Sequence, residues 1–258
     1  MAAINSHNSW SRLEEVWLGD VYPAEFYEHL KPEVRDVFQQ ITEWTKEDLN
    51  KIDKEATVIV YTPAIPAEHG ELNYYKEHGY QVVKRSDVLN WITENAFTIG
   101  IAGTHGKTTT TSMTAHILRD SGYGCNAFLG GIASNYGTNF WSHEKNVVVV
   151  EADEYDGSFL KLAPNIAVIT AVDPDHLDIY GSSDEMTDTY RRFAAQVKKD
   201  GFLIHRSGLP VGTVAAESAD YSLHPPARYH ASGIVIRDHN YRFDWTDGEI
   251  VFKDLTTQ

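Results

Sequence analysis

A short glycine- and threonine-rich stretch carries the residue types that bind a nucleoside triphosphate. The stretch is Gly103-Thr104-His105-Gly106-Lys107-Thr108-Thr109. Its glycines let backbone N–H groups approach phosphate oxygens, its lysine can reach the β- and γ-phosphates, and the hydroxyl of Thr108 can ligate Mg²⁺. Ile101 stands where the general G-x-x-x-x-G-K-[ST] pattern has its first glycine. We therefore predict an ATP site formed by these seven residues, with a spacing that departs from the general pattern.

Carboxylates follow the next apolar run of the chain. Glu151 comes directly after Val147–Val150, and Asp153, Glu154 and Asp156 lie close by. A carboxylate at the carboxyl end of a parallel strand lies at the edge where open α/β sheets bind their ligands. Glu151 is therefore predicted to be a second Mg²⁺ ligand, and the alternative is a solvated acidic loop.

A histidine lies in the polar cluster that follows a further apolar run. The cluster is Asp173-Pro174-Asp175-His176-Leu177-Asp178. A single histidine is commonly structural or exposed, but one flanked by aspartates at a sheet edge can contact a metal or a phosphate. His176 is therefore a candidate metal ligand, with a structural role as the alternative.

Apolar runs alternate with amphipathic segments between residues 96 and 205. The predicted strands are Phe97–Ala102, Asn146–Val150, Ile166–Val172 and Gly201–His205. Near-continuous apolar strands separated by helices indicate a parallel sheet that is covered on both faces. We predict an α/β fold with a mostly parallel, P-loop-type sheet and helices on both of its faces.

Two helices are predicted between these strands. In Lys107–Ser121, we expect Met113, Ile117 and Leu118 to form the buried face. Ser183 is predicted to cap the second helix. Its apolar residues recur at helical spacing, at Met186, Tyr190, Phe193, Ala194 and Val197.

The two ends of the chain differ from this central region. Residues 206–258 alternate apolar and polar side chains, and Thr246-Asp247-Gly248-Glu249 is typical of a hairpin turn, which indicates a small antiparallel β appendage. Residues 54–94 are typical of an incomplete α/β segment. We predict three parts: an atypical N-terminal segment over residues 1–53, the α/β segment over 54–94, and the nucleotide domain over 95–258.

Composition restricts the class of protein. The formal net charge is −15, which argues against a nucleic-acid partner because binding phosphate backbones needs clustered Lys and Arg. No apolar run is long enough for a membrane span, and no secretory signal is visible. Cys125 is the only cysteine, which is typical of a reducing compartment. We expect a cytoplasmic protein without a membrane or nucleic-acid partner.

In combination, three motifs resemble the Mur ligase family. They are the phosphate loop, Glu151-Ala152-Asp153-Glu154 and Asp175-His176-Leu177-Asp178. This family uses a G-T-x-G-K-T loop, which accounts for Ile101. Thr62–Pro66 resembles the end of its UDP-binding domain, and Gly130-Gly131 with Gly137-Thr138-Asn139 resembles its muramyl-substrate loop. The resemblance covers roughly residues 54–258. It implies a remnant of the UDP-binding domain, an ATP-binding central domain that is incomplete at its C-terminal end, and an absent C-terminal ligase domain.

The resemblance implies an ATP-dependent ligase of peptidoglycan precursor synthesis. Such an enzyme would join L-alanine to UDP-N-acetylmuramate through an acyl phosphate, with ADP and phosphate as products and Mg²⁺ as cofactor. It implies that Lys107 contacts the γ-phosphate, that Thr108 and Glu151 hold one Mg²⁺, and that His176 helps to hold a second. The implied substrate-binding residues are Thr104, His105, Gly130, Gly131 and Asn139.

Three alternatives remain open from the sequence. One is a murein-tripeptide recycling ligase, which attaches a peptide instead of L-alanine. Another is a nucleotide-binding module without turnover, because a lid that keeps the acyl phosphate from water is expected to be missing. Finally, residues 4–19 resemble the start of an amidinotransferase, and this similarity over residues 4–50 suggests a mosaic or misassembled reading frame.

Overall fold

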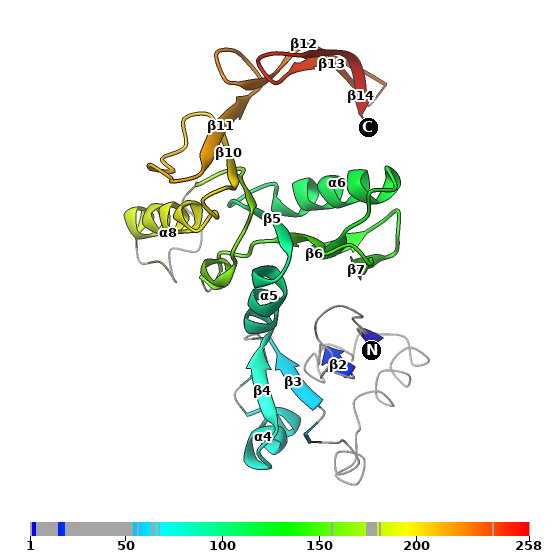
Figure 1. Ribbon diagram of the computed structural model, residues 1–258, viewed down its shortest axis with the longest axis vertical. Helices are drawn as coiled ribbons and strands as arrows, with labels where there is room; N and C mark the ends of the chain where they lie inside the picture. The colour runs from blue at the N-terminus through cyan, green and yellow to red at the C-terminus, as the bar shows by residue number, and fades with distance from the viewer. Residues whose placement is uncertain are drawn as a thin grey trace. The chain divides into compact units, whose positions relative to one another are not determined.

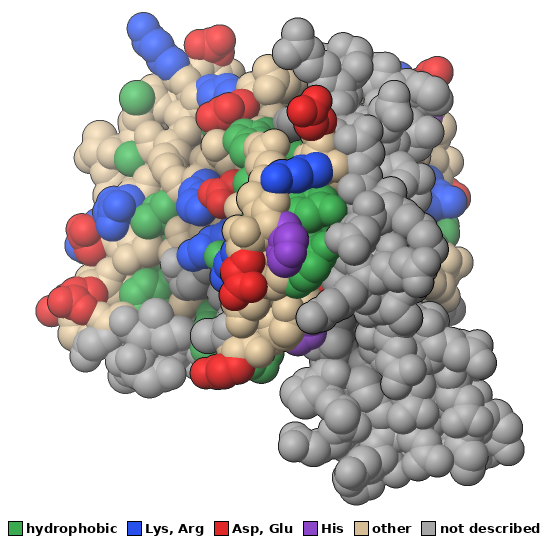
Figure 2. All heavy atoms as spheres, turned by 90° about the horizontal axis from the view of Figure 1, so that it is seen from below, with side chains coloured by type: hydrophobic (Ala, Val, Ile, Leu, Met, Phe, Trp, Pro, Cys, Tyr) green, Lys and Arg blue, Asp and Glu red, His purple; other side chains and the backbone are tan. Residues whose placement is uncertain are grey.

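The computed structural model divides into two compact units, Met1–Leu89 and Asn90–Gln258, and the division along the chain falls within helix α5 (Arg85–Glu94). The structure describes residues 2–3, 15–18, 54–55, 57–62, 65–66, 68–155, 157–173, 180, 182–238 and 240–257. Among these residues, none of the helices has both the length and the apolar character needed to cross a bilayer. On the face drawn in Figure 2, basic side chains are interspersed with acidic ones and form no single large patch.

The second unit is built on one large sheet (Figure 1). Its described strands lie in the order β14-β13-β12-β11-β10-β9-β5-β8-β6-β7. The strands from β6 to β11 in this order all pair in parallel. Their bounds are β5 Phe97–Ala102, β6 Asn126–Ala133, β8 Val147–Glu151, β9 Ile166–Ile169, β10 Phe202–Arg206 and β11 Glu217–Ser222. The predicted mostly parallel sheet is confirmed.

Helices α6 (Lys107–Asp120) and α8 (Ser183–Ala195) cover opposite faces of this sheet. Ile101 of β5 packs in one cluster with Ala115 of α6. The adjacent Gly100 faces α8, because a Cβ there would lie 3.6 Å from Phe193 Cζ. Since consecutive residues of a strand point to opposite faces, the two helices must lie on different sides. The prediction of helices on both faces is confirmed.

The apolar spacing of α8 predicts its buried face correctly. Met186, Tyr190, Phe193, Ala194 and Val197 are all buried. Phe193 stacks on Phe159 of the short 3-10 helix η1 (Ser158–Lys161), with ring centroids 4.9 Å apart. The cap lies one residue earlier than predicted, because the hydroxyl of Ser182 accepts the Glu185 N–H at 3.2 Å.

The predicted buried face of α6 is wrong at two of its three residues. Met113 is 50% exposed and Ile117 is 61% exposed. The residues that face the sheet are Thr111 and Ala115, with Leu118 packed partly against the core. Spacings of four and three place these residues on one stripe of the helix, and Met113 and Ile117 lie on the other side. The small side chains of Thr111 and Ala115 therefore contact the sheet together with Leu118, whereas Met113 and Ile117 face solvent.

The antiparallel strands lie at the two edges of the sheet. At one edge, β7 (Thr138–Trp141) pairs with β6. At the other, β12 (Tyr229–Arg237) pairs antiparallel with β13 (Asn240–Thr246), and β13 with β14 (Val251–Thr257). The predicted appendage and its turn are confirmed, and β12 joins the appendage to β11. Sequence analysis missed β6, β7 and β11.

The first unit contains a smaller sheet in the order β1-β2-β3-β4. Its described strands are β1 Ala2–Ala3, β2 Glu15–Leu18, β3 Thr57–Tyr61 and β4 Gln81–Lys84. Strands β2, β3 and β4 are parallel, and helix α4 (Gly70–Glu77) lies between β3 and β4 in the chain. Gly79 ends this helix region with φ +72°, a conformation that favours glycine. Strands from the predicted segments 1–53 and 54–94 thus belong to one sheet.

The different exposure of Phe193 and Met113 gives a test of the core. Phe193→Ala removes a fully buried ring, and we expect it to lower the free energy of unfolding by about 3–5 kcal/mol. Met113→Ala is the control, and its expected effect is within about 0.5 kcal/mol because the side chain is half exposed. Urea denaturation followed by circular dichroism measures both. Equal losses in the two variants would contradict this assignment of the core.

Candidate nucleotide site

The predicted phosphate loop lies between the end of β5 and the start of α6. Gly103 has φ +136° and Gly106 has φ +80°, so both adopt conformations that favour glycine. At Gly103 there is also no space for a side chain, because a Cβ would lie 2.1 Å from Thr170 Oγ1. The loop leads directly into the N-terminus of α6, where unpaired backbone N–H groups favour an anion. The local geometry therefore fits a phosphate-binding loop.

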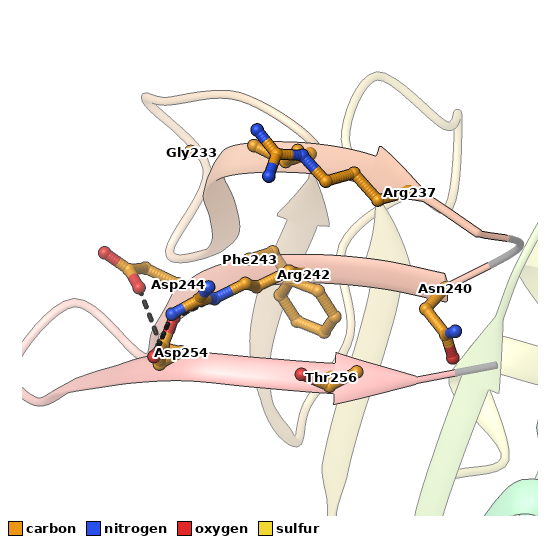
Figure 3. A pocket seen from close by; sticks show the side chains of 9 residues that line it. Gly233, Arg237, Asn240, Arg242, Phe243, Asp244, Asp254 and Thr256 are labelled. Carbon is orange, nitrogen blue, oxygen red and sulfur yellow. Dashed lines mark hydrogen bonds and ion pairs between the residues drawn. The ribbon is translucent and has the colours of Figure 1, made fainter.

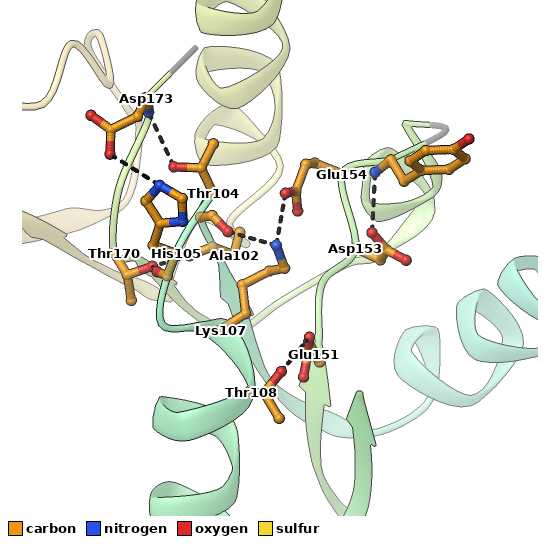
Figure 4. A network of polar contacts seen from close by, with 12 residues as sticks. Ala102, Thr104, His105, Lys107, Thr108, Glu151, Asp153, Glu154, Thr170 and Asp173 are labelled. Atoms are coloured by element: carbon orange, nitrogen blue, oxygen red, sulfur yellow. Dashed lines mark hydrogen bonds and ion pairs between the residues drawn. The ribbon is translucent and has the colours of Figure 1, made fainter. Parts of the chain in front are cut away.

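Residues that follow β9 hold this loop in place (Figure 4). The hydroxyl of Thr170 lies 3.1 Å from the Ala102 carbonyl oxygen and 2.5 Å from that of His105. The Thr104 N–H donates to the carbonyl of Ala171, and its hydroxyl accepts the Asp173 N–H, both at 3.1 Å. Sequence analysis missed Thr170, because only the pairing of β5 with β9 brings it to the loop.

The ammonium group of Lys107 forms two hydrogen bonds with buried residues. Its Nζ donates to the Gly103 carbonyl at 2.8 Å and to Glu154 Oε1 at 2.7 Å. The Lys107 side chain is 16% exposed, whereas that of Glu154 is 2% exposed. Burial raises the pKa of the Glu154 carboxyl, and the hydrogen bond and charge of Lys107 oppose that rise. Sequence analysis had placed Glu154 near the site but given it no role.

Thr108 and Glu151 form the second polar pair. The Thr108 hydroxyl donates to Glu151 Oε1 at 3.0 Å, and the Gly130 N–H donates to Glu151 Oε2 at 2.8 Å. Glu151 ends β8 and lies opposite Ile101 in the ladder, so strand pairing brings the carboxylate to the loop. Sequence analysis predicted that Thr108 and Glu151 act together, and the structure brings their oxygen atoms together.

These two side chains fit Mg²⁺ as a nucleotide-bound ion. Mg²⁺ prefers oxygen ligands and commonly takes one or two from the protein, with phosphates and water supplying the others. Over the described ranges, no three His, Cys, Asp or Glu side chains gather as a metal cluster. The Thr108 hydroxyl and the Glu151 carboxylate are oxygen donors of the kind that such an ion takes from a protein. His176 lies outside the described residues, as do Asp175 and Asp178.

The predicted substrate residues are placed in different ways. A Cβ on Gly130 would lie 2.4 Å from Glu151 Oε1, and one on Gly131 would lie 3.3 Å from Thr108 Cγ2, so this part of β6 lies against the loop. Thr104 is buried with its hydroxyl engaged, whereas the His105 side chain is 71% exposed and stands 3.9 Å from Asp173. Asn139 is exposed on β7.

The antiparallel strands β12, β13 and β14 form a separate hollow of about 560 Å³ (Figure 3). It shares no residue with the phosphate loop. In its wall, Arg242 and Asp254 form an exposed ion pair, and the Asp254 N–H donates to Asp244 Oδ1 at 2.9 Å. These opposite charges offset one another, so the hollow lacks the concentrated positive field of a phosphate site.

Comparison with known proteins assigns the region that contains the phosphate loop to a protein family. A model of the Mur ligase middle domain matches residues 101–250. The chain is 41% identical over 241 residues to a UDP-N-acetylmuramate--L-alanine ligase of Parabacteroides distasonis, which covers 92% of this chain and 52% of that protein. It is 45% identical over 209 residues to a protein of that name from Porphyromonas gingivalis, with 77% and 46% covered. The chain thus spans about half the length of the curated relatives it matches.

Solved structures share the fold. A UDP-N-acetylmuramate:L-alanyl-gamma-D-glutamyl-meso-diaminopimelate ligase from Neisseria meningitides superposes with a TM-score of 0.63 at 21% identity, covering 74% of this chain and 65% of that chain. A UDP-N-acetylmuramate-alanine ligase from Thermotoga maritima gives 0.63 at 22% identity, with 77% and 46% covered.

These matches decide between the sequence resemblances. All the relatives and structures named above are ligases, so the amidinotransferase similarity of residues 4–19 gains no support from them. The Parabacteroides match covers a larger share of the chain than residues 54–258 make up, so it extends into the preceding segment. The family model spans more than half of the chain and includes the complete phosphate loop, Glu151 and the end of β9. The chain therefore belongs to the Mur ligase family, whose middle domain it carries.

Proposed function

We propose that this chain is the nucleotide-binding part of an ATP-dependent ligase that joins L-alanine to UDP-N-acetylmuramate. The observation that carries the proposal is that the Lys107–Glu154 and Thr108–Glu151 contacts both lie where the phosphate loop meets the carboxyl end of β8. Relatives that are 41–46% identical have the name of this activity, which supports the choice of substrates. We propose that the reaction takes place in the cytoplasm, since a single cysteine is typical of a reducing compartment.

The chemistry follows from the weakness of a carboxylate as an acyl donor. The carboxylate oxygen of UDP-N-acetylmuramate attacks the γ-phosphorus of ATP, and the bond to the β–γ bridging oxygen breaks, which gives an acyl phosphate and ADP. The amine of L-alanine then attacks the acyl carbon, loses a proton, and expels phosphate to leave the amide. Lys107 and the N–H groups at the start of α6 offset the charge on the phosphoryl oxygens in the first step.

The metal role is proposed for oxygen donors that already lie together. Thr108 and Glu151 would hold one Mg²⁺, which supplies a positive charge that neutralises the phosphates. His176 is proposed as a ligand of a second ion. We propose that Thr104, His105, Gly130, Gly131 and Asn139 bind substrate. Of these, Gly130 and Gly131 have the strongest support, because they lie against the loop and Glu151.

Two other functions remain candidates. A ligase that attaches a tripeptide instead of L-alanine is the alternative left open by the sequence, and the Neisseria protein, at 21% identity, shares the fold alone. A nucleotide-binding module without turnover needs only the phosphate loop and its polar partners, which lie together among the described residues. In domain terms, we propose a central domain over residues 95–258 and a remnant of a UDP-binding domain over 54–94.

A product assay tests the proposed activity. The purified chain is mixed with ATP, Mg²⁺, UDP-N-acetylmuramate and L-alanine, and phosphate release and amide formation are measured. We expect both products only when all components are present. Replacing L-alanine by the tripeptide tests the second candidate, since product with the peptide alone would contradict our choice of acceptor. Nucleotide binding without any product would favour the module without turnover.

Lys107→Ala tests the phosphate loop directly. Loss of a charge-assisted contact with the phosphates is expected to raise the dissociation constant for ATP by roughly tenfold or more, as measured by calorimetry. Lys199→Ala is the matched control, because Lys199 is an exposed lysine outside the loop. Circular dichroism checks that both variants fold, since Lys107→Ala leaves the buried Glu154 without its cation. Equal ATP affinities in the two variants would exclude our assignment of the loop.

Glu151→Gln tests the magnesium site. The amide keeps the size of the side chain but removes its charge, so Mg²⁺ should increase ATP affinity about tenfold less than in the unmodified chain. With EDTA present, the two proteins should bind ATP similarly or the variant more tightly. Glu185→Gln makes the same change at an exposed position on α8 and serves as the control. An unchanged Mg²⁺ dependence in Glu151→Gln would remove Glu151 from the site.

A further inference from the structure

The side chain of Glu154 is buried beside the phosphate loop, and the proposed mechanism gives it no role. It lies three residues after the end of β8, and its carboxylate meets Lys107 at 2.7 Å (Figure 4). Its other oxygen, Oε2, is buried and has no hydrogen-bond partner among the described residues. Burying a carboxylate costs free energy unless the carboxylate is paired. We therefore expect the Glu154 carboxylate to have a role at the site beyond packing.

The ammonium group of Lys107 has three N–H donors, and two acceptors on the protein side bind it. These acceptors are the Gly103 carbonyl at 2.8 Å and Glu154 Oε1 at 2.7 Å. Both Gly103 and Glu154 are buried, whereas the lysine side chain keeps some exposure. The two bonds therefore hold the ammonium group on its buried side. Its remaining N–H donor is left for a ligand that arrives from solvent.

A phosphate that binds Lys107 is not expected to break the contact between Lys107 and Glu154. If the lysine moved away, Oε1 would lose this partner while Oε2 already has none among the described residues, and removing one member of a buried ion pair is strongly unfavourable. A lysine that keeps Glu154 and adds a phosphate contact avoids that cost. The contact therefore favours a fixed, bridging lysine over one that exchanges partners.

The backbone around Glu154 is itself held in place. The Gly157 N–H and the hydroxyl of Tyr180 both donate to the Glu154 carbonyl, the former at 2.9 Å. The adjacent Asp153 carbonyl accepts the Phe159 N–H and the Ser158 hydroxyl, each at 3.1 Å. These bonds join the segment after β8 to η1, so the carboxylate is presented from a fixed turn.

We propose that Glu154 is a positioning residue, which together with the Gly103 carbonyl holds the Lys107 ammonium in the place where it meets the terminal phosphate of the nucleotide. The inference rests on the proposed nucleotide site and assigns a role that the loop motif does not contain. Its physical benefit is preorganisation, because a long, flexible lysine is ordered before the ligand binds and loses less freedom on binding.

A double-mutant cycle on the full chain tests this role. Glu154→Gln keeps an acceptor oxygen without the charge, and Glu154→Ala removes the acceptor. Each is made alone and combined with Lys107→Met, and the dissociation constant for ATP is measured by calorimetry. We expect ATP affinity to fall in the order unmodified chain, Glu154→Gln, Glu154→Ala, with the alanine variant about tenfold weaker. In the Lys107→Met background, the substitutions at Glu154 should leave ATP affinity unchanged, since Glu154 acts through the lysine.

Other outcomes would overturn the proposal. Tighter ATP binding by Glu154→Gln would mean that the carboxylate competes with phosphate for Lys107. Equal weakening in both backgrounds would mean that Glu154 supports the fold alone, and no weakening in either would mean that it has no role in binding. If the unmodified chain itself binds no ATP, the nucleotide site fails and this inference fails with it, whereas normal binding without coupling removes the inference alone.

A second measurement covers variants that do not fold, which thermal unfolding would reveal. The unmodified chain is labelled with ¹⁵N-lysine, and the Nζ signal of Lys107 is assigned by its loss in Lys107→Arg. We expect this ammonium to exchange slowly with water and to remain visible both without nucleotide and with ATP, because Glu154 and Gly103 hold it in both states. A signal that is absent without nucleotide, or lost when ATP binds, would contradict the bridging arrangement.

Discussion

The parallel pairing of β5 with its neighbours β8 and β9 is the constraint on which the site depends. The carboxyl ends of the three strands meet at one edge of the sheet, so the residues that follow each strand lie close together. The phosphate loop follows β5, Glu151 ends β8, and Thr170 comes directly after β9. Ile101 and Val147–Val150 are buried within this sheet, so burial of the apolar strands also fixes the polar ends.

The site has two polar pairs with different surroundings. The Thr108–Glu151 pair is the more accessible one and offers oxygen atoms that suit a hydrated cation. The Lys107–Glu154 pair is buried, which strengthens its electrostatic attraction and makes its separation costly. One pair can therefore accept a metal ion, while the other holds a fixed positive charge beside it. Both features suit a site at which a phosphoryl group is transferred.

Much of the fold could be predicted because burial leaves a periodic pattern. The apolar run at Phe97–Ala102 and the helical spacing in α8 each reported a buried face correctly. The pattern failed in α6, where the small residues Thr111 and Ala115 approach the sheet while Met113 and Ile117 face solvent. It also failed at β6, because the segment around Gly130 and Gly131 has too little alternation to indicate a strand, and at β7, which is only 4 residues long.

For the site, the sequence by itself determined the loop and the carboxylate that follows β8. Both are encoded locally, in the spacing of Gly103, Gly106 and Lys107 and in the position of Glu151 after a valine run. Only the tertiary structure decided which partners these residues meet. Thr170 donates a hydrogen bond to the carbonyl of Ala102, which lies 68 residues earlier in the sequence. Glu154 accepts a hydrogen bond from Lys107, which lies 47 residues earlier. Such contacts arise from strand order and burial. They cannot be predicted from the sequence alone, because many possible strand pairings are compatible with the same local pattern of residues.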